Sequence, residues 1–301
     1  MISACSSPQE SLLRVGTNQW TGYETLYLAR DLDFFNSKYI KLKELPSSTE
    51  VIRAFKQGRL DVAALTLDEV LLLAQTEQDL RIFLVMDISN GADKVIVGKD
   101  ILQLSELKNK TIAMEGSALG AYMLYHLLKA AKLDLSDVKV NSATVDQHLE
   151  LMINGKSDAV ITFDPTASSL TRLGYRELFN SSQIPNKIVD VLVTKQSVIE
   201  QQGDNLAALI SGQWRALDYL QSNPSDAYRR IVPRLAISVS ELDGSYKTLK
   251  LPAQLQNQQL FAKNNPVGLH TTLQELAIVL HKVKLIQDIP ALDSILTDEL
   301  I

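Results

Sequence analysis

The sequence has little of what disulfide-linked, metal-binding or nucleic-acid-binding proteins require. Its 301 residues contain one cysteine, Cys5, which excludes intrachain disulfides and cysteine-cluster metal sites. The 30 lysines and arginines are outnumbered by 35 aspartates and glutamates, and the net charge of −5 supplies no general cationic field for nucleic acid. No apolar run reaches the roughly 18 residues that a membrane span needs.

Catalytic and nucleotide-binding motifs are also missing. The sequence has no Walker phosphate loop, no dinucleotide-binding glycine pattern and no nucleophile elbow. Its four histidines, His126, His148, His270 and His281, do not have the spacing of metal ligands. We therefore expect no cofactor, no metal and no enzymatic activity.

What the sequence does have is an alternation of short apolar strands with helices. Strands are predicted at 13–17, 40–45, 61–65, 80–85, 94–97, 111–114, 138–140, 158–161 and 188–193. Helices are predicted at 23–30, 51–56, 67–74, 118–131, 146–153, 206–220 and 271–283, with others opened by Asp164-Pro165 and Asn223-Pro224 and a loop-rich segment at 243–263. This order predicts an α/β fold with largely parallel sheets, and the length suits two domains.

The alternation restarts with a constant offset of 97 residues. Gly58-Arg-Leu-Asp61 resembles Gly155-Lys-Ser-Asp158, and the strand beginning at Val15 has its counterpart at Ile112. Both aspartates precede buried strands, and we interpret them as structural. Two similar α/β lobes explain the repeat.

The last third adds one strand and several helices, too little for a third lobe. We expect it to complete the first lobe, so that the chain crosses between lobes twice. The predicted organisation is an N-terminal tail at 1–11, a first lobe formed by 12–97 and 188–301, and a second lobe formed by 98–187.

Ligands of open parallel sheets bind beyond the carboxyl ends of the strands, so the predicted strand ends identify candidate ligand residues. The residues at or just after those ends are Asn18, Trp20, Tyr23, Thr66, Asp68, Ser89, Asn90, Glu115, Gly116, Ser117, Thr162, Phe163 and Asp164. Their amides and hydroxyls suit hydrogen bonding to a small polar molecule, and the aromatic rings supply flat walls.

The charge of that ligand follows from two opposing features. Helix N-termini at the strand ends favour anions by about 0.3–1 kcal/mol each. Carboxylates oppose them at Glu24, Asp68, Asp93, Glu115 and Asp164, and no lysine or arginine occupies a predicted strand end. We therefore expect a neutral or cationic, nitrogen-containing solute.

Several candidates also have a structural interpretation. Trp20 and Tyr23 suit a core position as well as a ligand wall, and Asp164 suits a helix N-cap. Glu115 is the sharpest candidate, because a carboxylate between a buried strand and Gly116-Ser117 has little structural purpose.

Five segments resemble a known family. Residues 19–29 (Gln-Trp-Thr-Gly-Tyr-Glu-Thr-Leu-Tyr-Leu-Ala), 90–93, 155–165, 181–193 and 214–224 are similar to bacterial ABC-importer solute-binding proteins of the nitrate/sulfonate/thiamine-pyrimidine group. The resemblance extends from residue 13 to about residue 235. It implies the type II periplasmic-binding-protein fold, in which two α/β lobes joined by a double crossover close on a solute.

The resemblance also implies partners and excludes one activity. The protein would be a monomer that delivers its solute to an ABC permease and its ATPase in the membrane. In that family, the loops facing the ligand correspond to Trp20, Tyr23, Thr66, Asn90, 115–117 and 162–164. A eukaryotic branch makes a thiamine pyrimidine with a cysteine-rich iron motif, and a single cysteine argues against that activity.

The N-terminus bears on the cellular location. Ile2-Ser-Ala-Cys5-Ser-Ser7 resembles the end of a bacterial lipoprotein signal, in which the cysteine carries lipid, although no basic and apolar stretch precedes it. We expect a periplasmic or extracytoplasmic protein anchored through Cys5. The alternative to transport is a ligand-sensing receptor module of the same fold that reports to a signalling partner.

Overall fold

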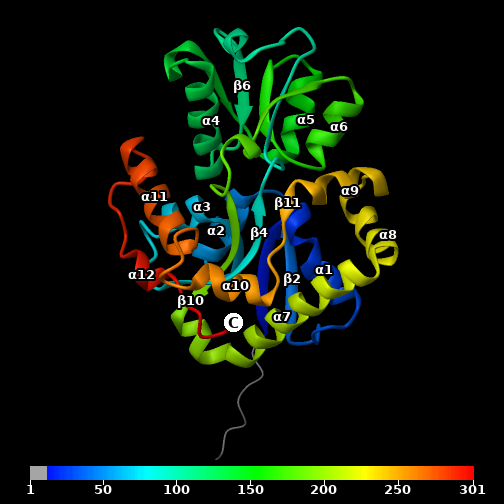
Figure 1. The fold of residues 1–301 in the computed structure, drawn as a ribbon, viewed down its shortest axis with the longest axis vertical. Coiled ribbons are helices and arrows are strands. Elements are labelled where there is room, and N and C mark those ends of the chain that lie inside the picture. The colour runs from blue at the N-terminus through cyan, green and yellow to red at the C-terminus, as the bar shows by residue number, and fades with distance from the viewer. Residues whose placement is uncertain (1–11) are drawn as a thin grey trace, which may run out of the picture.

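The computed structural model of the protein describes residues 12–301, which form two β-sheets covered by helices (Figure 1). The predicted tail and Cys5 lie outside the described residues. Within 12–301, no helix is both long enough and apolar enough to cross a membrane.

The first sheet has six strands in the order β11-β4-β10-β3-β1-β2. They are β1 (Leu13–Asn18), β2 (Ile40–Leu45), β3 (Val62–Thr66), β4 (Leu80–Ser89), β10 (Val189–Lys195) and β11 (Leu249–Lys250). Helices α1 (Glu24–Asp31), α2 (Ser48–Lys56) and α3 (Leu67–Leu73) connect the early strands. β1 runs parallel to β2 and β3, whereas β10 runs antiparallel to β3 and β4.

The second sheet has five strands in the order β7-β6-β8-β5-β9. They are β5 (Lys94–Val97), β6 (Thr111–Met114), β7 (Lys139–Ser142), β8 (Ala159–Thr162) and β9 (Arg176–Asn180). Helices α4 (Ala118–Ala131), α5 (Val145–Ile153) and α6 (Thr166–Arg172) belong to this part of the chain. Short 3₁₀ helices are η1 (Thr21–Tyr23), η2 (Leu104–Leu107), η3 (Leu135–Asp137) and η4 (Ser181–Gln183).

The α/β class is confirmed, but both sheets are mixed rather than largely parallel. β5 pairs antiparallel with β8 and β9, and β10 pairs antiparallel with β3 and β4. Each of these strands enters its sheet from the other sheet, so it runs against its neighbours. β5 therefore belongs to the second sheet, whereas the prediction placed 94–97 in the first lobe; a short apolar strand does not encode which sheet it joins.

The chain crosses between the sheets twice, once between β4 and β5 and once between β9 and β10, and the two crossing segments lie next to each other. Hydrogen bonds tie them together: the hydroxyls of Ser89 and Ser181 are 2.7 Å apart, and the backbone N–H of Gly91 donates to Ser181 Oγ at 2.7 Å. Gly91 has a φ of +115°, a backbone conformation that favours glycine.

The 97-residue repeat is present in three dimensions. Val15 pairs with Val62 in the first sheet, and Ile112 pairs with Ala159 in the second, each position shifted by 97. Asp61 Oδ2 accepts the backbone N–H of Arg14 at 2.8 Å, and Asp158 Oδ2 accepts that of Thr111 at 2.8 Å. Gly58 and Gly155 both have positive φ, +67° and +63°. Both aspartates are therefore structural, as the sequence indicates.

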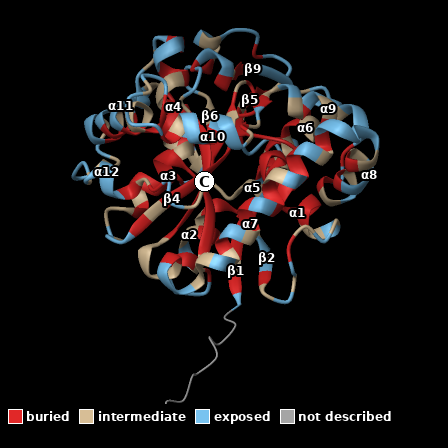
Figure 2. Ribbon diagram, turned by 60° about the horizontal axis from the view of Figure 1, so that its bottom comes forward, coloured by how far each residue is buried: buried red, intermediate tan, exposed pale blue. Residues whose placement is uncertain are grey.

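The C-terminal helices return to the first sheet. They are α7 (Gln196–Ser222), α8 (Pro224–Leu235), α9 (Val239–Lys247), α10 (Gln254–Phe261), α11 (Leu269–Lys282) and α12 (Leu292–Ile295). α7 and α8 contact α1, α11 contacts α3, and α12 contacts β4. Figure 2 shows that buried residues follow the strands and the inward faces of these helices.

The prediction of a loop-rich segment at 243–263 is wrong, since α9, β11 and α10 occupy most of that range. α9 begins with a capping box between Ser238 and Glu241. α10 is polar because Asn257 attaches it: its side chain accepts from Val85 N at 2.8 Å and donates to Val85 O at 3.1 Å. Asn257 and Phe261 are the buried residues of this helix, so it has little apolar periodicity to detect.

Candidate functional site

The carboxyl ends of β1, β3, β6 and β8 meet at a cavity between the two sheets. The cavity has two adjoining parts, which we call the first and second compartments. The first is lined by Asn18, Trp20, Tyr23, Ser48, Thr66, Glu69, Asp93, Glu115, Leu119, Phe163 and Asp190. The second is lined by Asp93, Glu115, Ser117, Leu119, Gly120, Val145, His148, Ile161, Thr162 and Phe163.

The compartments are small and share part of their walls. The space not filled by protein atoms is about 330 Å³ in the first compartment and about 280 Å³ in the second. The region that the centre of a water molecule could occupy is about 20 Å³ in each. They share Asp93, Glu115, Leu119 and Phe163. A ligand seated there would be compact and largely enclosed.

The cavity brings together eight of the thirteen candidates from the sequence: Asn18, Trp20, Tyr23, Thr66, Glu115, Ser117, Thr162 and Phe163. Asp68, Ser89, Asn90, Gly116 and Asp164 line neither compartment. Ser89 lies in the crossing between the sheets and Gly116 is exposed. The ligand role of the eight lining residues stays a prediction.

The aromatic wall of the first compartment is fixed by two buried aspartates. Trp20 Nε1 donates to Asp87 Oδ2 at 2.9 Å, and the Tyr23 hydroxyl donates to Asp190 Oδ1. η1 carries both rings, and a Cβ on Gly22 would stand 1.8 Å from Asp87 Oδ2. Only glycine permits this approach, which explains the Trp-Thr-Gly-Tyr order. Trp20 and Tyr23 are both buried residues and cavity walls.

Asp87 and Asp190 are cross-strand partners on β4 and β10. Burial raises the pKa of both carboxyl groups, that of Asp87 to about 8 and that of Asp190 well above its usual range. The charge of Asp87 raises the pKa of Asp190 further, whereas hydrogen bonding to Trp20 and Asp190 lowers that of Asp87. Ionising both buried carboxyls of this cross-strand pair without a compensating cation is costly, so the pair favours a protonated state.

Glu69 is another carboxyl that lines the first compartment, and it lies in the first turn of α3. Its Oε1 accepts from the Ser48 hydroxyl at 2.6 Å, and its Oε2 accepts from Thr66 N at 3.0 Å. Burial, followed by the charge of Asp68, raises the pKa of Glu69. This carboxyl is fully engaged by neighbouring donors.

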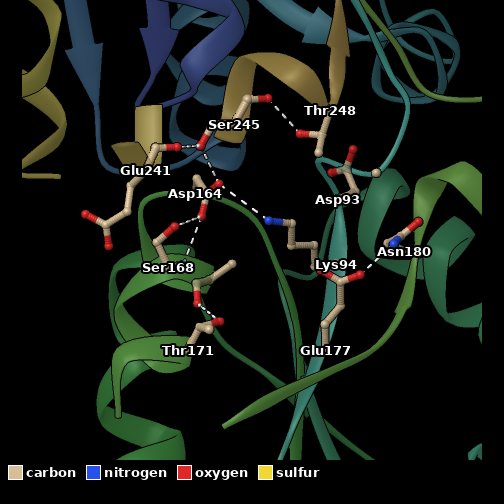
Figure 3. Close-up of polar contacts among 12 residues, drawn as sticks. Asp93, Lys94, Asp164, Ser168, Thr171, Glu177, Asn180, Glu241, Ser245 and Thr248 are labelled. Atoms are coloured by element: carbon tan, nitrogen blue, oxygen red, sulfur yellow. Dashed lines mark hydrogen bonds and ion pairs between the residues drawn. The ribbon is translucent and has the colours of Figure 1, made fainter. Parts of the chain in front are cut away.

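Asp93 lines both compartments, and its Oδ2 is buried with no hydrogen-bond partner. The residue is 3 % exposed, and burial raises its pKa to about 6. The ammonium of the adjacent Lys94 lies 3.5 Å from Asp164 Oδ2 instead (Figure 3). A buried acceptor of this kind is costly unless something donates to it.

Glu115 and Phe163 join the two sides of the cavity. Glu115, after β6, accepts from Thr49 N at 3.0 Å and from Thr49 Oγ1 at 2.6 Å, in the first turn of α2. Phe163, after β8, meets Trp20 edge-to-face with ring centroids 5.0 Å apart. Both contacts link the second sheet's loops to the first sheet, so the cavity is closed in this structure.

Asp164 forms a third link between the sheets rather than part of the cavity wall. Its Oδ1 accepts from Ser168 N at 2.9 Å, and its Oδ2 accepts from the Ser245 hydroxyl of α9 at 2.5 Å (Figure 3). The predicted N-cap position of Asp164 is one residue off, because Pro165 takes that place. Asp164 still satisfies a free N–H in the first turn of α6.

His148, Thr162 and Ser117 of the second compartment all have hydrogen-bond partners within the protein. His148 Nε2 lies 3.2 Å from Ala143 O and therefore donates to it, which leaves Nδ1 to accept from Thr162 Oγ1 at 3.2 Å. Burial lowers the pKa of His148 to about 4, so the ring is neutral near pH 7. Ser117 Oγ caps α4 by accepting from Gly120 N at 3.2 Å.

Sequence reasoning missed eight lining residues, and Asp93 entered only as a nearby carboxylate. The eight are Ser48, Glu69, Leu119, Gly120, Val145, His148, Ile161 and Asp190. Asp190 carried a usable signal: an acid inside an otherwise apolar strand requires a partner. Among residues 12–301, no three His, Cys, Asp or Glu side chains could together hold a metal ion.

The fold is shared with proteins of known structure. The alkanesulfonate-binding protein SsuA from Xanthomonas axonopodis pv. citri, bound to MOPS, is 15 % identical over 95 % of this chain and 98 % of its own, with a TM-score of 0.79. The periplasmic nitrate-binding protein NrtA from Synechocystis PCC 6803 is 11 % identical over 98 % and 88 %, with a TM-score of 0.75. The predicted type II periplasmic-binding-protein fold is confirmed.

The same fold also supports catalysis elsewhere. The desulfurization enzyme DszB is 14 % identical over 96 % of this chain and 97 % of its own, with a TM-score of 0.67. A search of curated protein sequences finds no match. The sequence profile of the NMT1/THI5-like family matches residues 20–227, more than half of the chain, and the protein is therefore a member of that family.

Proposed function

We propose that the protein is an extracytoplasmic solute-binding protein of an ABC importer. It captures a small, positively charged, nitrogen-containing solute between its two lobes and presents it, as a monomer, to the permease and its ATPase. It carries out no chemistry on the solute. The family and the fold shared with SsuA and NrtA support the transport role.

One observation carries the choice of ligand charge. Four carboxyl side chains line the first compartment, at Glu69, Asp93, Glu115 and Asp190, and no described lysine or arginine lines either compartment. An anion would meet these groups without a compensating charge. A cation would pair with them in a medium of low dielectric constant, where the attraction is strong.

Closure of the lobes accounts for capture. Glu115 and Phe163 contact one lobe's wall from the other, so a solute seated between them favours the closed form. The enclosed cavity requires the lobes to separate before a solute can enter. Closed and open forms then present different surfaces to the permease.

A thermal-shift screen tests the proposal. Amines, amidines and aminopyrimidines are compared with sulfonates, nitrate and aromatic acids at pH 7.5. A binder at 100 times its Kd should add about 2.7 kcal/mol to the free energy of unfolding. We expect stabilisation by nitrogenous cations, and stabilisation by anions alone would contradict the proposal.

A further inference from the structure

The two compartments differ in what they leave unsatisfied. Among the described residues, the buried polar atoms without a partner that line the cavity are Asp93 Oδ2 and Thr66 Oγ1. Both line the first compartment, and Asp93 also lines the second where the two share a wall. The other carboxyls there are already engaged, since Glu69, Glu115 and Asp190 each accept from a side-chain hydroxyl. The first compartment therefore offers acceptors to one small donor group.

The donor must carry N–H bonds. A quaternary ammonium brings charge but no proton, so Asp93 Oδ2 would stay buried without a hydrogen bond. Lys94 does not fill this role, because Figure 3 shows its ammonium at Asp164, with no dashed contact to the Asp93 carboxylate. A primary ammonium has three donors on a compact head and matches the acceptors present.

The second compartment suits an uncharged tail. Among its polar groups, His148 bonds Ala143 and Thr162, and the Ser117 hydroxyl caps α4. The carboxyls of Asp93 and Glu115 belong to the wall that it shares with the first compartment, and the rest of its wall is apolar, supplied by Leu119, Val145, Ile161 and Phe163. The neutral His148 adds no charge for a second cationic group.

We infer that the solute is a short primary monoamine, with its ammonium against Asp93 and Thr66 in the first compartment and its apolar tail in the second. The inference rests on the proposed function and specifies its ligand. The tail is short, because the second compartment has little free room: the centre of a water molecule could occupy only about 20 Å³ of it. The compartments share Asp93, Glu115, Leu119 and Phe163 in their walls, and the inferred ligand extends from one into the other.

Isothermal titration of the full chain at pH 7.5 with four chloride salts tests the inference: methylammonium, propylammonium, propane-1,3-diammonium and tetramethylammonium. Each buried methylene should tighten binding about fourfold, so propylammonium should bind about 15-fold tighter than methylammonium. The diammonium should bind at least tenfold more weakly than propylammonium, because its second charge enters the apolar compartment. Tetramethylammonium should not bind.

A variant locates the tail. Val145→Phe fills the second compartment from the start of α5 and should weaken propylammonium at least tenfold while changing methylammonium less than twofold. Val267→Phe, at a position 68 % exposed, is the matched control and should change neither.

The outcomes separate this inference from the proposed function. If the diammonium or tetramethylammonium binds tightest, or if Val145→Phe weakens both monoamines equally, the inference is wrong and the cation-binding function stands. The same holds if none of the four salts binds but another cation from the thermal-shift screen does. Binding of anions alone would overturn both.

Discussion

At the scale of single residues, the cavity is built from buried carboxyls that stabilise the protein only when protonated or paired. Asp93 is the clearest case, since its Oδ2 has no partner and its pKa is raised to about 6 by burial. Its serine and lysine neighbours, Ser89 and Lys94, lower that pKa without cancelling the effect of burial. A bound cation would therefore stabilise the ionised Asp93 carboxylate more than its protein neighbours do.

Asp93→Asn should therefore stabilise the empty protein, and increasingly so as pH rises. A carboxyl whose folded pKa is raised contributes stability below its unfolded pKa, near 4, and loses it as pH rises through its folded pKa, near 6. Asparagine lacks this loss. We expect the advantage of the variant to grow by about 2 kcal/mol between pH 4 and pH 7.

Urea unfolding of the empty proteins at pH 4, 5, 6 and 7 measures this difference. Asp204→Asn, which removes one exposed charge from α7, is the control and should show no such growth. A stability difference that stays constant from pH 4 to pH 7 would show that Asp93 is not buried and unpaired as described.

At the scale of elements, the repeat contains the same contact twice: an aspartate before one strand accepts a backbone N–H of the neighbouring strand. The two copies differ in exposure and in their additional partners. Asp61 accepts from Arg14 N, Nε and Nη2, and its side chain is 11 % exposed. Asp158 accepts from Thr111 N, with Lys110 Nζ at 3.7 Å, and its side chain is 41 % exposed. The buried, charge-assisted copy holds β1 to β3 more strongly than its counterpart holds β6 to β8.

Alanine substitutions should show this inequality. Asp61→Ala should lower the free energy of unfolding by about 2 kcal/mol, because it leaves a partly buried N–H and a guanidinium without their acceptor. Asp158→Ala should lower it by about 1 kcal/mol, since water replaces the lost contacts. Equal losses in chemical denaturation would show that exposure does not set the difference.

Much of this organisation was predictable from the sequence because local patterns encode it. Buried strands such as β1 and β3 end in polar residues, so Asn18 and Thr66 could be placed at the cavity by the strand-end rule. The sheet that receives β5 could not be predicted, since a strand of four residues, three of them apolar, suits either sheet. α10 was missed because it buries one amide, Asn257, and one apolar side chain, Phe261, rather than an apolar face.

The acidic site was only partly predictable, for a related reason. Glu115 stands after its strand and could be singled out, whereas Asp190 lies inside β10 and faces the cavity only because that strand returns between β3 and β4. Asp164 follows its strand as Glu115 does, yet it bonds Ser245 across the lobes. Which of two equivalent strand ends faces the cavity depends on packing between distant segments.

At the scale of the whole molecule, the fold and the ligand are separate questions. SsuA and NrtA are named for sulfonate and nitrate binding, and this chain shares their fold with a cavity lined by carboxyls. A shared fold does not fix the chemistry of a site placed on it. The central claim is therefore about charge: the cavity binds a cation through Asp93.

One titration tests that claim most directly. Propylammonium, or the cation that stabilises the protein most in the screen, is titrated calorimetrically into the natural sequence, Asp93→Asn and Asp204→Asn at pH 7.5. Loss of a buried charged hydrogen bond should weaken binding about 10- to 100-fold in Asp93→Asn and leave Asp204→Asn unchanged. Unchanged or tighter cation binding by Asp93→Asn would contradict the account.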